Sequence, residues 1–160
     1  MEATSEPGAG TVFRVYLPRI DARAEAIHDR AVSDEPPGGT EVILLVEDER
    51  QVRDVAARML GYLGYEVLSA DSGSAALDCS RQHAGAIDLL LTDVIMPQQN
   101  GKQLAERLVQ ERPGLRVLYM SGHTDDSIAH HGVLDAGVEL IRKPFTHQEL
   151  ATRVRQRLDS

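Results

Sequence analysis

Residues 87–97 read Ile87-Asp88-Leu89-Leu90-Leu91-Thr92-Asp93-Val94-Ile95-Met96-Pro97, an apolar run that ends in a single carboxylate and then a proline. Because the run is apolar on both faces, it predicts a central strand of a parallel sheet that helices cover. Ligands of such sheets bind at the carboxyl ends of the strands, so Asp93 lies where chemistry is expected. A similar run, 42–46, leads into Glu47 and Asp48. Two strands can therefore bring three carboxylates together, an arrangement that favours a cation.

Strand patterns and helix patterns alternate from Glu41 to the end of the chain. The predicted strands are 42–46, 66–70, the run in 87–97, 116–120 and 138–141, and the predicted helices are 50–63, 72–82, 101–111, 125–136 and 147–158. This alternation predicts an α/β fold with right-handed crossovers, a doubly wound five-stranded parallel sheet in the order 2-1-3-4-5 and helices on both faces. In that order the ends of strands one and three converge, and Ser121 and Lys143 arrive from strands four and five.

Composition limits the classes of partner. The chain has 160 residues, of which 42% are hydrophobic, enough for one core and an appendage. A net charge of −8 gives no basic patch for nucleic acid or for an anionic membrane. Cys79 is the only cysteine, which favours a reducing compartment, so the cytoplasm is expected. No apolar run approaches the roughly 20 residues of a membrane span.

Residues 1–40 differ from the rest of the chain. The segment 8–18 has glycines and then alternating apolar and polar residues up to Pro18, which predicts one strand without a partner. The segment 19–40 is rich in Ala, Asp, Glu and Arg and ends in Pro36-Pro37-Gly38-Gly39, which predicts a weak helix or coil followed by a flexible linker. The domain boundary is expected near Thr40.

The residues at the predicted strand ends match the needs of phosphoryl chemistry. Mg²⁺ prefers oxygen ligands and is usually held by one or two carboxylates together with phosphate oxygens, a description that fits Asp48 and Asp93. A carboxylate can also attack phosphorus if cations neutralise the transferred oxygens, and Mg²⁺ and Lys143 would supply that charge. The Ser121 hydroxyl can donate a hydrogen bond to a phosphoryl oxygen.

Each of these features alone has a simpler interpretation. An acid after a strand is often a helix cap or turn former, Ser121-Gly122 alone is a turn, and Lys143-Pro144 alone is a solvated lysine before a rigid bend. Together they favour a site, because all lie at carboxyl ends of strands. The pair His130-His131 is interpreted as surface histidines, since neighbours on a helix point about 100° apart.

The motifs together resemble the receiver domain of two-component response regulators. They are Val46-Glu47-Asp48-Glu49, Thr92-Asp93-Val94-Ile95-Met96-Pro97 with Gly101, Ser121-Gly122 and Lys143-Pro144-Phe145. The resemblance covers residues 41–158 and implies a flavodoxin-like fold. It implies that Asp93 is the phosphoacceptor, that Asp48 binds Mg²⁺ directly, that Glu47 acts through water and that the Ile95 carbonyl is a further ligand. Ser121 and Lys143 fall at the hydroxyl and lysine positions of the family pattern.

One position departs from the family pattern. Three residues before the lysine, where the family often has Tyr or Phe as a rotating switch, this chain has Leu140. A leucine cannot perform that movement as an aromatic ring does, so the strand-five face is expected to change little on phosphorylation.

The N-terminal segment is similar to part of another domain. Residues 6–18 resemble the final strand of the histidine-kinase ATP-binding domain, including its glycine-rich approach. The implied organisation is a remnant of that domain over 1–18, a linker over 19–40 and the receiver over 41–158. The parent chain is then a hybrid sensor histidine kinase, and the fragment itself is not a stand-alone enzyme beyond its own phosphorylation and dephosphorylation.

The sequence therefore predicts a receiver that takes a phosphoryl group from the phosphohistidine of a histidine kinase or histidine phosphotransfer domain. Two alternatives stay open. One is a pseudo-receiver that binds proteins without phosphorylation, and the other is an aspartyl-phosphate phosphatase of the haloacid dehalogenase type. Such phosphatases usually carry a second acid two positions after the nucleophile, where this chain has Ile95. A homodimer is also left open.

Overall fold

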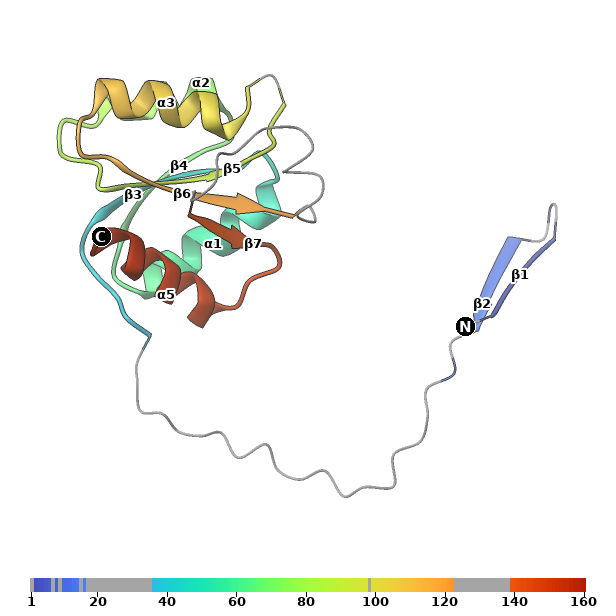
Figure 1. Ribbon diagram of the computed structural model, residues 1–160. Helices are drawn as coiled ribbons and strands as arrows, with labels where there is room; N and C mark the ends of the chain where they lie inside the picture. The colour runs from blue at the N-terminus through green and yellow to red at the C-terminus, as the bar shows by residue number, and fades with distance from the viewer. Residues whose placement is uncertain are drawn as a thin grey trace. The chain divides into compact units, whose positions relative to one another are not determined.

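The computed structural model of the chain describes residues 2–6, 8, 10–14, 16, 36–97, 99–122 and 139–160 (Figure 1). The chain divides into two compact units, Met1–Asp34 and Glu35–Ser160. The predicted helix 125–136 with His130-His131 lies outside the described residues, as does the predicted linker up to residue 35.

The larger unit is built on a five-stranded parallel sheet. Its strands are β3 (Val42–Val46), β4 (Glu66–Ala70), β5 (Leu89–Asp93), β6 (Arg116–Ser121) and β7 (Leu140–Arg142). The order across the sheet is β4-β3-β5-β6-β7, and every pairing is parallel. If β3 is counted as the first strand of this sheet, the order is the predicted 2-1-3-4-5. The last strand begins two residues later than predicted.

Helices cover both faces of this sheet (Figure 1). They are α1 (Arg50–Tyr62), α2 (Gly73–Gln82), α3 (Gly101–Glu111) and α5 (His147–Leu158). The Ser72 side chain caps α2, and Thr146 with Glu149 forms a capping box that starts α5. Within the described ranges, no helix combines the length and apolar character that a membrane crossing requires.

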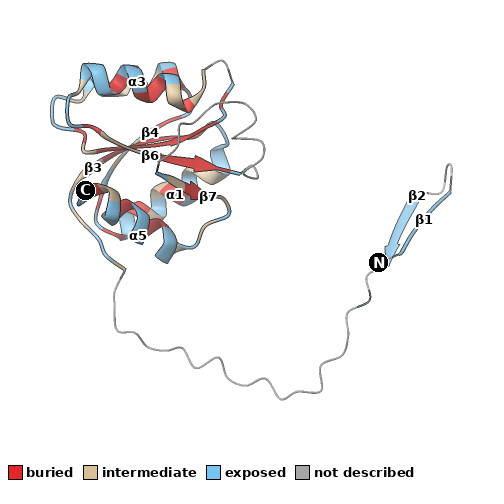
Figure 2. Ribbon diagram, viewed as in Figure 1, coloured by how far each residue is buried: buried red, intermediate tan, exposed pale blue. Residues whose placement is uncertain are grey.

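Two hydrophobic cores lie on opposite sides of the strands. Side chains alternate along each strand, so Ile43 and Leu45 join α1 and α5 in one core, whereas Leu44 and Val46 join α2 and α3 in the other. The central strand β5 is buried at all five positions. In Figure 2 the buried residues, in red, gather along strands in the middle of the sheet. Burial on both faces explains why residues 89–93 have no polar residue before Thr92 and Asp93.

One apolar residue of α1 does not reach the core. Val55 belongs to the helical series of apolar residues on α1, yet it is 48% exposed. It lines a hollow of about 470 Å³ with Val52 and Met59 of the same helix and with Pro144 and Phe145. The apolar stripe of α1 therefore extends past the sheet to the segment that follows β7.

The smaller unit corrects the prediction of a single unpaired strand. Residues Gly10–Arg14 form β2, which pairs antiparallel with β1, Glu2–Glu6. Gly8 lies between the two strands with φ of 83°, a conformation that costs glycine little. The prediction missed β1 because that strand is polar and exposed at all five positions and therefore carries no apolar alternation.

Candidate functional site

The carboxyl ends of β3 and β5 hold three carboxylates. Glu47 and Asp48 directly follow β3, and Asp93 is the last residue of β5. These strands are neighbours in the sheet, and each of the three residues has a carboxylate oxygen within 4.8 Å of one from each of the others. Glu47 and Asp93 are buried, whereas Asp48 is exposed. The strand order thus brings the three acids together at one edge.

Lys143 joins this cluster from the segment after β7. Its ammonium donates to Glu47 Oε2 at 2.8 Å and to Asp93 Oδ2 at 2.6 Å. The backbone N–H of Lys143 donates to the carbonyl of Ser121 at 2.7 Å, which ties the segment to the end of β6. The lysine is mostly buried, so both ion pairs lie in a poorly hydrated environment.

Burial and pairing shift the ionisation of two members of the cluster. Burial raises the pKa of Glu47 above its ordinary value of 4.5, and the nearby Asp93 adds to this, although Lys143 opposes it. Burial alone would lower the pKa of Lys143, but its hydrogen bonds to Asp93 and Glu47 outweigh that effect and raise the pKa. Lys143 is therefore a cation throughout the physiological pH range.

The loop after β5 holds Asp93 from the backbone side. Asp93 Oδ1 accepts a hydrogen bond from the Ile95 N–H at 3.1 Å. The N–H of Gly101, the first residue of α3, donates to the Val94 carbonyl at 3.0 Å. A Cβ atom at position 101 would lie 2.1 Å from the Asp93 carbonyl oxygen. The start of α3 can approach the end of β5 this closely only because residue 101 is glycine.

The remaining predicted site residues lie at the same edge. Ser121 is the last residue of β6 and is buried. Ile95 has a side chain 46% exposed and lines a hollow of about 320 Å³ with Asp48, Asp93 and Lys143. The six residues named from the sequence, Glu47, Asp48, Asp93, Ile95, Ser121 and Lys143, therefore come from the ends of four strands at one edge of the sheet.

The donors in the cluster suit a hard divalent cation. Three carboxylates and one ammonium leave two negative charges uncompensated within the cluster when all are ionised. The atoms that the acids offer to a metal are all carboxylate oxygens. Mg²⁺ takes such ligands and keeps part of its water shell, which the exposure of Asp48 permits. Glu47, Asp48 and Asp93 are the side chains that could hold it.

Arg53 is a further residue at the site that the sequence interpretation missed. Its guanidinium Nη1 donates to the carbonyl of Glu47 at 2.6 Å and lies 3.4 Å from the carbonyl of Asp48. A basic residue one turn into the helix that follows two acids is a signal that could have indicated this contact.

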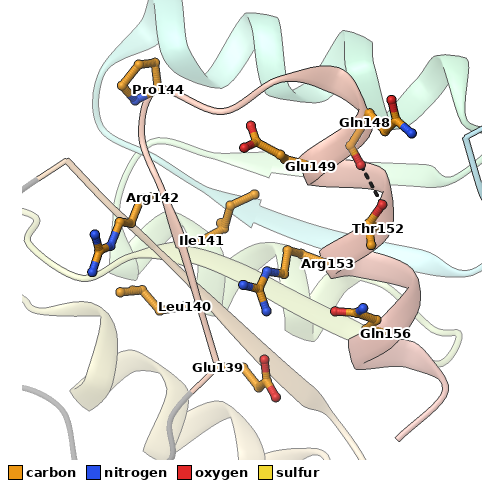
Figure 3. Close-up of a pocket in the computed structure, with 10 residues that line it drawn as sticks. All are labelled: Glu139, Leu140, Ile141, Arg142, Pro144, Gln148, Glu149, Thr152, Arg153 and Gln156. Atoms are coloured by element: carbon orange, nitrogen blue, oxygen red, sulfur yellow. Dashed lines mark hydrogen bonds between the residues drawn. The ribbon is translucent and has the colours of Figure 1, made fainter. Parts of the chain in front are cut away.

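A larger hollow of about 1000 Å³ lies elsewhere, along β7 and α5 (Figure 3). Leu140, the position where the family often has an aromatic residue, lines it together with Arg153 of α5. None of the six residues predicted for the site lines this hollow. The clustered acids are thus separate from it.

Comparison with known proteins connects this arrangement to other chains. The chain is 34% identical over 162 residues to the sensor kinase CckA of Brucella abortus, an alignment that covers 97% of this chain and 17% of that protein. It is 28% identical over 116 residues to the response regulator receiver protein CpdR of Brucella abortus, covering 72% of this chain and 95% of that protein. The chain therefore spans only a small part of the length of the sensor kinase, but nearly the whole length of the receiver protein.

A solved structure and a family profile agree with these relatives. The crystal structure of the receiver domain from the hybrid histidine kinase CckA matches with a TM-score of 0.62 and 41% identity, covering 73% of this chain and 98% of that domain. Residues 43–155 match the family described as the response regulator receiver domain. With its sheet order and its cluster of strand-end acids, the chain belongs to the response regulator receiver domain family.

Proposed function

We propose that this chain is the phosphoacceptor receiver of a two-component phosphorelay, in which Asp93 takes a phosphoryl group from phosphohistidine in the presence of Mg²⁺. The observation that carries the proposal is the position of Asp93. Its Oδ2 lies 2.6 Å from the Lys143 ammonium, and Glu47 and Asp48 lie beside it. A carboxylate, a fixed cation and two further acids at one point are what phosphoryl transfer to Asp93 with a bound Mg²⁺ would need.

In the proposed reaction a carboxylate oxygen of Asp93 forms a bond to phosphorus. The bond between phosphorus and the donor imidazole nitrogen breaks, its electron pair leaves with that nitrogen, and Asp93 becomes an acyl phosphate. Lys143 stabilises the transferred oxygens by its charge, and the Ser121 hydroxyl can donate to one of them. Asp48 and Asp93, Glu47 through water and the Ile95 carbonyl would hold Mg²⁺, which supplies further positive charge to the phosphoryl oxygens.

The proposed donor is a histidine kinase or histidine phosphotransfer domain that docks on α1. Val55 is 48% exposed beside the apolar hollow that α1 forms with Pro144 and Phe145, and Lys143 lines the same hollow. An exposed apolar surface next to a reactive group suits a protein donor. Val55→Glu should slow transfer from a protein donor and leave labelling by a small phosphodonor unchanged. Val109→Glu on α3, where the valine is 40% exposed, is the control.

The two alternatives are disfavoured by specific features. Lys143 pairs with both Glu47 and Asp93, the last residue of the buried strand β5. A pseudo-receiver, which is not phosphorylated, has no need of this pairing. A phosphatase of the haloacid dehalogenase type would need a second acid at position 95, where Ile95 lies. Family membership also favours the receiver over the phosphatase.

We also propose that residues 1–18 are the end of a histidine-kinase ATP-binding domain, joined through a linker over 19–40 to the receiver over 41–158 of a cytoplasmic part of a hybrid sensor kinase. Val12, Phe13 and Tyr16 of the hairpin unit are each more than half exposed, and further strands or helices of a larger domain would cover such side chains. The similarity to the sensor kinase CckA extends over 97% of the chain, beyond the receiver.

Intact-mass measurement after treatment with acetyl phosphate tests the phosphoacceptor assignment. We expect one added phosphoryl group with Mg²⁺ and none with EDTA. Asp93→Asn should abolish the addition, whereas Asp71→Asn, which changes an exposed acid just after β4, should not. Equal labelling of Asp93→Asn would refute the assignment, and no labelling of the wild type under any phosphodonor would favour the pseudo-receiver.

A further inference from the structure

Arg53 of α1 contacts the backbone of the acidic turn, residues 47–49, rather than its carboxylates. Its Nη1 donates to the Glu47 carbonyl at 2.6 Å and lies 3.4 Å from the Asp48 carbonyl. The backbone N–H of Arg53 also donates to the Glu49 carbonyl at 3.0 Å. The Arg53 side chain therefore contacts the backbone of Glu47 and Asp48, whereas its bond to Glu49 is the ordinary first backbone hydrogen bond of the helix.

Lys143 holds the Glu47 carboxylate at 2.8 Å, and the Glu47 N–H donates to the Ala70 carbonyl at 3.2 Å. What Arg53 adds is a restraint on the peptide that links Glu47 to Asp48. Glu49 is the N-cap of α1, yet it makes no side-chain capping hydrogen bond. The Glu49 N–H donates to Glu47 Oε1 at 3.3 Å, a long contact. Adjacent negative charges on Glu47, Asp48 and Glu49 repel one another, so an external group helps the turn to hold one conformation. A guanidinium, which keeps its charge and has several donors in a fixed plane, suits this role.

We propose that Arg53 is a positioning residue that fixes the directions of the Glu47 and Asp48 carboxylates and thereby raises the affinity of the site for Mg²⁺. This inference rests on the proposed function. Groups that orient the ligands of a metal contribute to affinity without touching it, because they reduce the reorganisation that binding requires. Arg53 acts on the backbone that carries both carboxylates, so one side chain restrains two ligands.

The positive charge of Arg53 has the opposite effect on a cation. If charge were its main contribution, removing it would make Mg²⁺ bind more tightly, because repulsion would be relieved. If positioning is its main contribution, removing it makes Mg²⁺ bind more weakly. The sign of the change in affinity therefore distinguishes the two roles.

Calorimetric titration of the full chain with MgCl₂ at constant ionic strength tests the proposal. We expect Arg53→Gln to raise the Kd for Mg²⁺ about tenfold. Arg53→Lys keeps the charge but has a shorter reach and should fall between wild type and Arg53→Gln. Arg50→Gln removes a charge from the same helical turn, where Arg50 forms an ion pair with Asp54 at 3.6 Å. This control should bind Mg²⁺ as tightly as wild type or more tightly.

Amide NMR spectra without Mg²⁺ supply a second readout. Arg53→Gln should shift the amide resonances of residues 47–49 in the metal-free protein. Arg50→Gln should leave the amide resonances of Glu47 and Asp48 unchanged. Equal or tighter Mg²⁺ binding by Arg53→Gln would overturn the proposal. If that variant does not fold, Arg53→Lys decides: weaker Mg²⁺ binding than wild type would support the proposal, and wild-type affinity would overturn it. Absence of Mg²⁺ binding in the wild type would instead refute the proposed function.

Discussion

The Lys143 ammonium lies 2.6 Å from Asp93 Oδ2 and 2.8 Å from Glu47 Oε2, so one cation is shared by two buried acids. Removing it leaves both carboxylates without their cationic partner. We expect Lys143→Met to lower the free energy of unfolding of the metal-free protein by about 2 kcal/mol. Part of that loss should return with Mg²⁺, because the ion replaces the missing charge. Urea denaturation with and without MgCl₂ measures both effects.

The chain offers a matched control for this prediction. Lys102 is the only other lysine, and it lies in α3 outside the hollow that the acids line. Lys102→Met should change the free energy of unfolding by less and should show no recovery specific to Mg²⁺. A Lys143→Met protein as stable as wild type in EDTA would contradict the prediction.

Glu47 gives a prediction about pH. Its pKa in the folded protein is raised from 4.5, chiefly by burial, so the folded state binds a proton more tightly than the unfolded state. The contribution of Glu47 to the free energy of unfolding therefore falls as the pH rises from about 4.5 through the raised pKa. In EDTA, Glu47→Gln should gain stability relative to wild type as the pH rises to 7. Denaturation at a series of pH values measures this difference.

In EDTA at neutral pH we expect Glu47→Gln to be more stable than wild type, and with Mg²⁺ we expect wild type to be the more stable of the two. The ion stabilises the folded wild type by binding to it, and the variant lacks one of the acids near the ion. If Glu47→Gln were progressively less stable than wild type in EDTA as the pH rose, the ionised carboxylate would be stabilising and the argument would be wrong.

Much of the fold could be predicted because its signals are local. The apolar runs of β3 and β5 end in acids, and the alternation of strands and helices restricts the order of the strands. The positions of Glu47, Asp48 and Asp93 then follow, since parallel strands end at a common edge. The strand order alone predicts that these carboxylates lie close together, and the directions of distant side chains do not enter this prediction.

Contacts made by long side chains could not be predicted in this way. Arg112 follows α3 but donates to Ser80 Oγ at 2.8 Å and to the carbonyls of His83 and Gly85, each at 2.7 Å, as well as to the Ser80 carbonyl. It thereby satisfies backbone groups where α2 ends. The partners precede it by as many as 32 positions, so only the packed fold brings them together. The contacts of Arg53 join residues only five and six positions apart, but they too depend on the direction of its side chain.

Gly101 predicts a steric effect on the site. A Cβ atom there would lie 2.1 Å from the Asp93 carbonyl oxygen, so α3 or the end of β5 must move in Gly101→Ala. We expect a loss of about 2 kcal/mol in the free energy of unfolding, together with slower labelling of Asp93 by acetyl phosphate. Chemical denaturation and intact-mass kinetics measure the two effects.

Gly61 of α1 is the matched control for this substitution. An added Cβ at Gly61 meets no atom within 4 Å, so Gly61→Ala should stabilise the protein by about 0.5–1 kcal/mol. Similar labelling rates and stabilities for the two alanine variants would contradict the steric argument.

The N-terminal unit should contribute little to the stability of the receiver. Both hairpin strands are exposed at every position, and an isolated two-stranded hairpin is marginally stable. Deleting residues 1–34 should therefore leave the melting temperature nearly unchanged. Deleting residues 1–40 should lower it, because the Gly39 N–H donates to the Leu63 carbonyl at 3.0 Å. A large drop on the shorter deletion would show that the hairpin packs on the domain or pairs between chains.

The last prediction concerns how phosphorylation changes the surface, and it follows from Leu140. This residue is half-buried, packs on the core that α2 and α3 cover, and lies opposite Tyr119 of β6 in the register. An aromatic residue at this position of the family is the usual switch, whereas leucine is smaller and has no hydroxyl. Its two rotamers would bury similar area, so they differ little in energy.

We therefore expect phosphorylation to alter Ser121 and the residues after it more than β7. Amide shifts with and without beryllofluoride should change most over residues 121–136 and only modestly over 138–142. In Leu140→Phe the changes over 138–142 should grow, because a ring can occupy space that Ser121 leaves when it moves toward the phosphoryl group. Wild-type changes centred on 138–142 and absent from 121–136 would refute this account, since β7 would then be the switching element despite its leucine.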